Sequence, residues 1–230
     1  MSLRTVLFDA GNTLISLDYP RLAAAVGGAT GVSLTADGLA ATAGDAALAL
    51  ERGDGTDRER ASRYLELLFE LAGVPRSRME LVRETLLQLH QERHLFGAMD
   101  PGTPAALTRL RQAGLRLAVV SNSDGRAEEA LAAVGILEQF EFVIDSQLVG
   151  IEKPDPRIFR IALERMGLEP AEGLYVGDIY EVDVIGARRA GLDVILMDPL
   201  GHHAGRDVRT ARNVAQAAEL VLLQERQVST

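Results

Sequence analysis

Val6-Leu7-Phe8-Asp9-Ala10-Gly11-Asn12-Thr13 places an aspartate directly after a short apolar segment and before a turn that contains glycine and asparagine. Residues 5–8 are all β-branched or apolar, which predicts a fully buried strand. Asp9 then stands at the carboxyl end of that strand. In open α/β sheets, ligands bind beyond the carboxyl ends of the strands. Asp9 is therefore the first candidate for a functional side chain.

Four further apolar segments predict strands, each followed by a turn and a helical pattern, and they span 115–121, 142–145, 174–177 and 194–197. A helix signal between two of them agrees with this, because Asp155 and Pro156 begin a helix that Gly167 ends. Strands that alternate with helices form a parallel sheet, and right-handed crossovers bring their carboxyl ends to one edge. The predicted fold class is α/β, with a Rossmann-like parallel sheet core.

A long insertion interrupts this pattern after the first strand. About eighty residues separate that strand from the next helix of the pattern, whereas a loop of this kind usually has roughly 2 to 6. Within the insertion, residues 59–72 and 80–95 repeat apolar side chains at helical spacing. The predicted domains are an α/β core of residues 1–15 and 97–230, and an inserted helical cap of residues 16–96.

Composition excludes several classes of function. The chain has 230 residues, of which 47% are hydrophobic, and its net charge of -9 argues against binding to a nucleic acid. It has no cysteine, which excludes disulfides, zinc–thiolate sites and a thiol nucleophile. It lacks a signal-peptide pattern, and no apolar run approaches the roughly 18 residues of a membrane span. We therefore expect a cytoplasmic protein that binds no membrane.

The chain has a single lysine, Lys153, and all its other basic residues are arginines. An ammonium is a compact point charge, whereas a guanidinium is a planar fork, so the two are not interchangeable. Keeping one lysine in a chain that otherwise avoids it indicates a site that needs an ammonium. Pro154 follows and favours an extended backbone at Lys153.

Polar segments stand at the other predicted strand ends or just before the next helix, namely Ser121-Asn122-Ser123, Glu152-Lys153-Pro154-Asp155-Pro156 and Gly177-Asp178-Ile179-Tyr180-Glu181-Val182-Asp183. In this order after the segment 9–13, they resemble the four motifs of the haloacid dehalogenase-like hydrolase superfamily. The resemblance covers residues 1–13 and about 100–198. The insertion stands where the first cap class of that superfamily carries its helical cap.

The chemistry of the aspartates agrees with this resemblance. An ionised aspartate such as Asp9 attacks phosphorus or carbon to form an ester that water then hydrolyses. Attack on a phosphoryl group brings two negative charges together, so Mg²⁺ and cationic donors are needed to offset the repulsion. Mg²⁺ prefers oxygen ligands, and Asp9 and Asp178 supply carboxylates. The resemblance adds the main-chain carbonyl of Gly11, and Asp183 is expected to hold a metal-bound water.

Three residues are expected to bind the phosphoryl group. Ser121 and Asn122 follow an apolar strand and open a turn, where a hydroxyl and main-chain amides can donate to phosphoryl oxygens. The ammonium of Lys153 is expected to neutralise both the nucleophile and the phosphoryl group.

Gly11 is a departure from the pattern of the phosphatase branch, where the residue two positions after the nucleophile is usually an aspartate that protonates the leaving oxygen. General acid–base catalysis accelerates a reaction about 10²- to 10⁴-fold, so its absence slows poor leaving groups without abolishing attack. Asp18, in the predicted cap, is one candidate for a replacement acid.

We predict a Mg²⁺-dependent phosphatase that acts on a small phosphorylated metabolite through an aspartyl-phosphate intermediate. A metal-independent 2-haloacid dehalogenase is the first alternative, although that branch typically has an aromatic residue in place of Gly11 and lacks the Gly177-Asp178 pair. A regulatory protein that binds a phosphate ligand with weak or no turnover is the second. Phosphonoacetaldehyde hydrolases need a cap lysine, which this chain lacks.

Overall fold

The computed structural model describes residues 2–50 and 57–228. The chain forms two compact units, of which one comprises Met1–Ser16 with Ala98–Thr230 and the other comprises Leu17–Gly97. Two short strands, β2 (Ser16–Leu17) and β3 (Phe96–Ala98), pair where the chain passes from one unit to the other. Neither of these short strands was predicted from the sequence.

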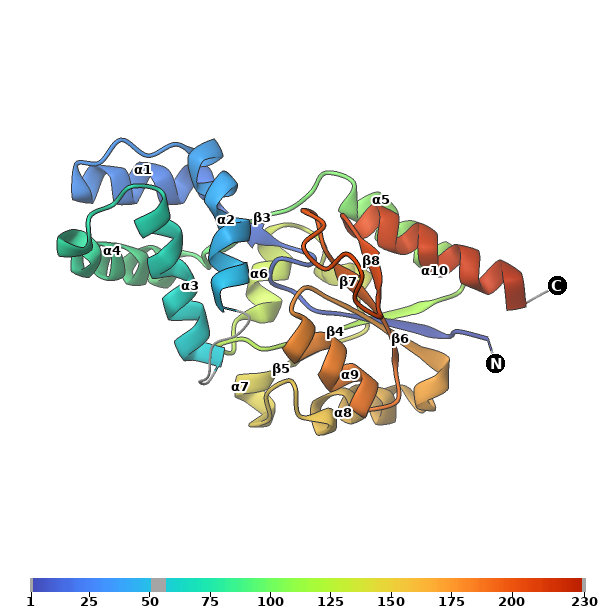
Figure 1. Ribbon diagram of the computed structural model, residues 1–230. Helices are drawn as coiled ribbons and strands as arrows, with labels where there is room; N and C mark the ends of the chain where they lie inside the picture. The colour runs from blue at the N-terminus through green and yellow to red at the C-terminus, as the bar shows by residue number, and fades with distance from the viewer. Residues whose placement is uncertain (1, 51–56, 229–230) are drawn as a thin grey trace. The chain divides into compact units, whose positions relative to one another are not determined.

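The first unit is built on a six-stranded parallel sheet with the strand order β5-β4-β1-β6-β7-β8 (Figure 1). The strands are β1 (Thr5–Phe8), β4 (Arg116–Ser121), β5 (Val143–Asp145), β6 (Gly173–Gly177), β7 (Asp193–Met197) and β8 (Arg209–Ala211). The prediction of an α/β fold with a Rossmann-like parallel sheet is confirmed. Five of the strands begin within one residue of their predicted positions, whereas β8 was missed because its three residues carry no apolar run.

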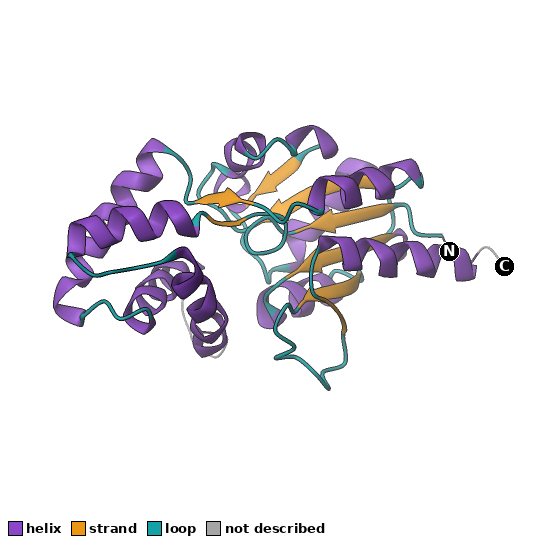
Figure 2. Ribbon diagram, turned by 90° about the horizontal axis from the view of Figure 1, so that it is seen from above, coloured by secondary structure: helices purple, strands orange, loops and turns teal. Residues whose placement is uncertain are grey.

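Helices cover both faces of this sheet (Figures 1 and 2). The helices of the unit are α5 (Thr103–Gln112), α6 (Ala127–Ala133), α7 (Ser146–Val149), α8 (Pro156–Met166), α9 (Ile185–Arg189) and α10 (Val214–Val228). α5 packs beside α10 on one face, and α8 packs beside α9 on the other. Within the described residues, no helix combines the length and the apolar character needed to cross a membrane.

Helix α8 shows how local signals set its ends. The Asp155 side chain accepts a hydrogen bond from the main-chain N–H of Arg157, and Gly167 ends the helix with a left-handed φ of 65°. Its apolar residues recur at helical spacing and are buried against the sheet, namely Ile158, Phe159, Ala162, Leu163 and Met166. The predicted beginning and end of this helix are confirmed. Because the helix begins at Pro156, it also fixes the position of Lys153 just before it.

The second unit is helical. Its helices are α1 (Tyr19–Thr30), α2 (Ala36–Leu50), α3 (Asp57–Leu71) and α4 (Met79–Glu92), and they enclose a separate apolar core. The sequence pattern extended the last helix to residue 95, but the backbone is already extended at Arg93. The guanidinium of Arg21 donates to the carbonyls of Leu89 and Arg93, which satisfies the end of α4 at this point.

Gly186 of α9 allows that helix to pack closely against its neighbours. A Cβ at this position would lie 2.9 Å from both the Phe159 ring and the Cα of Pro154. Because Pro154 Cα belongs to the backbone, Gly186→Ala is expected to destabilise the first unit by about 1–3 kcal/mol. Thermal and urea unfolding of the variant measure this loss.

Gly28→Ala is the matched control. Gly28 is an exposed helical glycine of α1, and a Cβ there meets no atom within 4 Å. Alanine favours a helix by about 1 kcal/mol over glycine, so this variant is expected to be slightly more stable than the parent. Equal stability of Gly186→Ala and the parent would contradict the packing described.

Candidate active site

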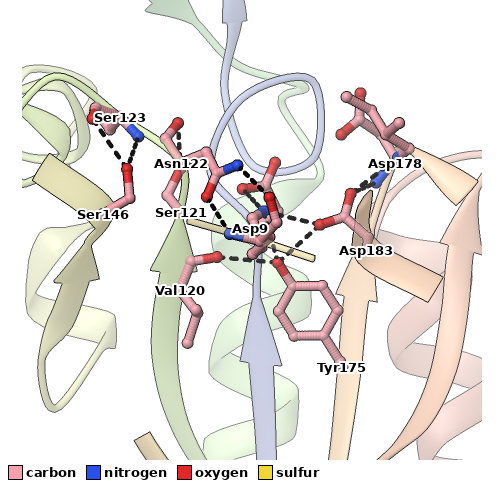
Figure 3. A network of polar contacts seen from close by, with 11 residues as sticks. Asp9, Val120, Ser121, Asn122, Ser123, Ser146, Tyr175, Asp178 and Asp183 are labelled. Carbon is pink, nitrogen blue, oxygen red and sulfur yellow. Dashed lines mark hydrogen bonds and ion pairs between the residues drawn. The ribbon is translucent and has the colours of Figure 1, made fainter. Parts of the chain in front are cut away.

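Asp9 lies directly beyond β1, near the middle of the strand order, and is only 7% exposed. Its main-chain N–H donates to the carbonyl of Val176 on β6 at 2.8 Å. The chain places β4 on one side of β1 and β6 on the other, so the connections diverge at this strand. Such a switch point is where open α/β sheets bind ligands. Figure 3 shows Asp9 among polar side chains from the neighbouring strand ends.

Lys153 brings a positive charge to Asp9. Its Nζ donates to Asp9 Oδ1 at 2.6 Å, to Asp183 Oδ1 at 2.8 Å and to the hydroxyl of Tyr175 at 2.9 Å. An ammonium has three protons, so these three acceptors use all of them. The side chain of Lys153 is 3% exposed. The lysine is thus a buried cation with a complete set of partners.

Asn122 holds the main chain of Lys153. Its Nδ2 donates to the Lys153 carbonyl at 3.1 Å, and its Oδ1 accepts from the Lys153 N–H at 2.8 Å. The carboxamide of Asn122 therefore fixes the lysine segment and does not point to a ligand, which leaves its main-chain N–H for the predicted phosphate contact. Ser121 ends β4, and its hydroxyl makes only a long contact of 3.5 Å to the Asn122 carbonyl.

Asp183 closes the loop that carries Asp178. Its Oδ2 accepts from the main-chain N–H groups of Asp178 at 3.0 Å and Ile179 at 2.9 Å, while Oδ1 faces Lys153. A Cβ on Gly177 would overlap the Asp183 side chain, so glycine is required there. Both oxygens of Asp183 thus accept hydrogen bonds from the protein itself.

Asp178 completes a group of three carboxylates. Ligand oxygens of Asp9, Asp178 and Asp183 all lie within 4.8 Å of one another. The Asn12 side chain, on a residue with a φ of 53°, hydrogen-bonds Asp178. Gly11 lies in the same loop and forms an isolated bridge with Ile15. The structure therefore brings together the predicted aspartates, with Gly11 in the loop that follows Asp9.

Burial and charge shift the pKa values of this group. Burial raises the pKa of Asp9 to about 6, although the Lys153 ammonium opposes the rise. Burial, followed by the charges of Asp9 and Asp183, raises the pKa of Asp178 well above its usual value. Burial disfavours the charged form of Lys153, but Asp183 and Asp9 outweigh it, so its pKa is raised. The ammonium therefore stays charged while the two aspartates resist ionisation.

Two functional neighbours escaped the sequence analysis. Tyr175 lies within the apolar strand β6, where the sequence pattern predicts an ordinary aromatic core residue, yet its hydroxyl contacts Lys153. Asp145, at the end of β5, accepts from the main-chain N–H groups of Gly125 and Ala127 and so holds the loop after β4. Its position at a strand end was the one signal in the sequence that pointed to it.

Asp18, considered as a replacement acid, has a structural role within the second unit. Its Oδ1 accepts from the main-chain N–H of Arg21 at the beginning of α1, and its Oδ2 lies 2.7 Å from the guanidinium of Arg93. Both carboxylate oxygens are therefore engaged inside its own unit.

Curated proteins share sequence with this chain. It is 42% identical over 130 residues to haloacid dehalogenase-like hydrolase domain-containing protein 3 of Mus musculus, which covers 56% of this chain and 51% of the relative. It is 39% identical over 145 residues to a phosphoserine phosphatase of Thermus thermophilus, which covers 63% of this chain and 55% of the relative. The chain spans about half the length of these relatives.

Solved structures share the fold over almost the whole chain. A HAD-hydrolase of Bacillus subtilis bound to magnesium matches with a TM-score of 0.69 and 22% identity, covering 96% of this chain and 99% of that one. A 2-haloacid dehalogenase of Pseudomonas syringae matches with a TM-score of 0.59 and 23% identity over the same shares. At these identities the likeness concerns the fold, which phosphatases and dehalogenases share.

The family is decided by the sequence match. The model of the family described as haloacid dehalogenase-like hydrolase matches residues 3–191, which include Asp9, Lys153 and the loop of Asp178 and Asp183. This range covers most of the chain and contains the carboxyl ends of β1, β4, β5 and β6. The chain belongs to the haloacid dehalogenase-like hydrolase family.

Proposed function

We propose that this hydrolase is a Mg²⁺-dependent phosphatase that cleaves a small phosphate ester through an aspartyl-phosphate on Asp9. The observation that carries the proposal is the grouping of Asp9 with Asp178 and the chain's single lysine, Lys153, at the switch point of the sheet. The Thermus thermophilus relative, a phosphoserine phosphatase, supports a small phosphorylated metabolite as the substrate class.

The carboxylates fit a divalent cation. Asp9, Asp178 and Asp183 carry three negative charges when ionised, and Lys153 carries one positive charge, so two negative charges are in excess. The donors are oxygens, which Mg²⁺ prefers. Asp9, Asp178 and the carbonyl of Gly11 would hold the ion, and Asp183 would hold the loop of Asp178. When bound, Mg²⁺ neutralises the charge that builds up on the phosphoryl oxygens.

The side chains have separate roles in the proposed reaction. Asp9 attacks phosphorus, and because Lys153 engages Oδ1, we assign the attack to Oδ2. The bond from phosphorus to the ester oxygen breaks at the same time, and the leaving oxygen takes its proton from water. Lys153 lowers the repulsion between the carboxylate and the phosphoryl group through its charge, since its protons are bound within the protein. The Ser121 hydroxyl and the Asn122 N–H donate to phosphoryl oxygens. Water then hydrolyses the aspartyl-phosphate, which releases inorganic phosphate and restores the Asp9 carboxylate.

Dehalogenation is the second candidate. The absence of a carboxylic acid at Gly11 favours it, because displacement of halide from carbon needs no proton donor at that position, although a glycine there differs from the aromatic residue typical of dehalogenases. Against it stands Asp178, a further carboxylate beside Asp9 whose raised pKa reflects burial and the neighbouring negative charges. A 2-haloacid is itself an anion, so without a metal ion to offset the excess negative charge of the three carboxylates its approach is opposed by repulsion.

Hydrolysis of an aryl phosphate and of a 2-haloacid, each with Mg²⁺ and with a chelator, separates these functions. We expect phosphate release that requires Mg²⁺, no halide release, and a fall of more than about 10³-fold in kcat for Asp9→Asn, because the variant lacks the nucleophile. Phosphate and halide assays on the purified protein measure both reactions.

The matched control is Asp207→Asn, which removes an exposed carboxylate and is expected to keep the activity of the parent. Halide release that ignores the chelator, without phosphate release, would establish the dehalogenase instead. A protein that turns over neither substrate but binds phosphate and Mg²⁺ would establish the regulatory alternative.

Asp178→Asn tests the proposed cation site through stability. The raised pKa of Asp178 means that folding disfavours its ionised form, so its charge lowers stability as the pH rises through that pKa. Without divalent ions at pH 8, the variant is expected to melt on the order of 3 °C higher than the parent, with a smaller gap at pH 5. Mg²⁺ is expected to stabilise the parent and to have little effect on the variant.

Thermal unfolding with chelator and with Mg²⁺ measures both effects. Two outcomes would argue that this aspartate does not hold the ion. One is a melting temperature of Asp178→Asn below that of the parent in chelator, and the other is a rise in melting temperature with Mg²⁺ as large as that of the parent.

Gly11→Asp tests the missing acid. Gly11 is not among the glycines with a left-handed φ, so an aspartate is compatible with the backbone there. The new carboxylic acid is expected to raise kcat/KM for alkyl phosphates by up to about 10²-fold and to change aryl phosphates little, since a phenolate leaves without protonation. Gly11→Asn is the control of the same size without an acid. No gain for alkyl phosphates would mean that another group already donates the proton, and equal gains for both substrate types would mean that the aspartate does not act as an acid.

A further inference from the structure

The hydroxyl of Tyr175 lies at the centre of the polar group, although the rest of its strand is apolar. Tyr175 is fully buried, and its Oη lies 2.9 Å from Lys153 Nζ, 2.9 Å from the Val120 carbonyl and 3.1 Å from Asp183 Oδ1. Figure 3 shows the ring rising from β6 with its hydroxyl turned toward Val120 and Asp183. One hydroxyl therefore links β4, the lysine segment and the turn after β6.

The protons in this group can be assigned from its donors and acceptors. Lys153 donates one proton each to Asp9, Asp183 and Tyr175, and the tyrosine oxygen is the one neutral acceptor of the three. The hydroxyl keeps one proton of its own, and the Val120 carbonyl at 2.9 Å and Asp183 Oδ1 at 3.1 Å are its two acceptors. Three fixed acceptors leave the ammonium no free rotation.

Packing alone does not require the hydroxyl. The Tyr175 ring meets the Phe159 ring edge-on at 4.9 Å between centroids, and a phenylalanine at 175 would make the same contact. A buried hydroxyl is costly unless it is hydrogen-bonded, so its presence in the strand is explained by the polar partners it finds there. Its contribution lies in where it holds the ammonium.

We propose that Tyr175 is a positioning residue whose hydroxyl holds the Lys153 ammonium against Asp9. The proposal deepens the proposed function, on which its kinetic part rests. Without the third acceptor, the ammonium turns away from the geometry in which its charge faces both Asp9 and an arriving phosphoryl group. The loss falls on the attack step and not on substrate binding, because Tyr175 is buried beneath the lysine.

Tyr175→Phe removes this hydroxyl and keeps the ring. With an aryl phosphate and saturating Mg²⁺, kcat is expected to fall about tenfold while KM stays within about twofold, the pattern of an interaction that acts in the transition state. Tyr180→Phe is the control, since it removes a hydroxyl five residues later and keeps the ring contacts with His203 and Arg206. It is expected to keep the kcat of the parent.

A second readout needs neither turnover nor metal. Because Lys153 is the only lysine, protein labelled with ¹⁵N at lysine Nζ gives a single side-chain ammonium signal. In the parent, three buried hydrogen bonds are expected to slow proton exchange enough for the signal to be seen at neutral pH. In Tyr175→Phe the signal is expected to shift and to broaden, because the ammonium protons exchange faster with water. In Tyr180→Phe the signal is expected to stay unchanged.

The outcomes separate this proposal from the proposed function. A signal that changes in Tyr175→Phe, in a parent that hydrolyses no phosphate ester, would support the placement of the ammonium and overturn the phosphatase. An unchanged signal with unchanged kcat, a rise in KM alone, or an equal loss in Tyr180→Phe would overturn the role of Tyr175. Ammonium protons that exchange in the parent as fast as those of free lysine would overturn it without any variant.

Discussion

The ion pairs of Lys153 are the interactions on which the rest of the site depends. Asp9 and Asp183 are both less than a tenth exposed and both contact the same ammonium. Removing one partner of a buried ion pair leaves an uncompensated charge and typically costs about 3–5 kcal/mol. With the ammonium in place, the Asp9 carboxylate can remain buried at the edge of the sheet. An arginine could not replace this lysine, because its guanidinium is larger and planar and cannot donate to three acceptors from a single nitrogen.

The fold places this ammonium through its main chain. Asn122 pairs with both main-chain polar groups of Lys153, as a neighbouring strand would, and Asp155 begins α8 two residues later. On the other side, Gly177 leaves the space that Asp183 occupies. The Asn122 carboxamide and the space at Gly177 thus hold the lysine between two strand ends without contacting a ligand themselves. Groups held by secondary structure in this way keep their geometry better than groups on free loops.

The sequence predicted the sheet well because its rules are local. Apolar runs bounded by turns predicted five strands, and capping signals predicted both ends of α8. The same rules failed where an element depends on distant partners. β8 has three residues and exists because it pairs with β7, and α4 ends early where Arg21, from the beginning of the unit, binds its last carbonyls.

For the site, the sequence by itself determined which functional groups stand at the sheet edge, namely Asp9, Lys153 and Asp178. Tertiary structure alone decided their contacts: the Asn122 carboxamide faces the main chain of Lys153, and the Tyr175 hydroxyl meets its ammonium. Periodicity tells which side of its own strand a residue faces. A hydrogen bond needs a distance of about 3 Å between groups on different segments, and that distance follows from strand order, register and packing, which no local pattern contains.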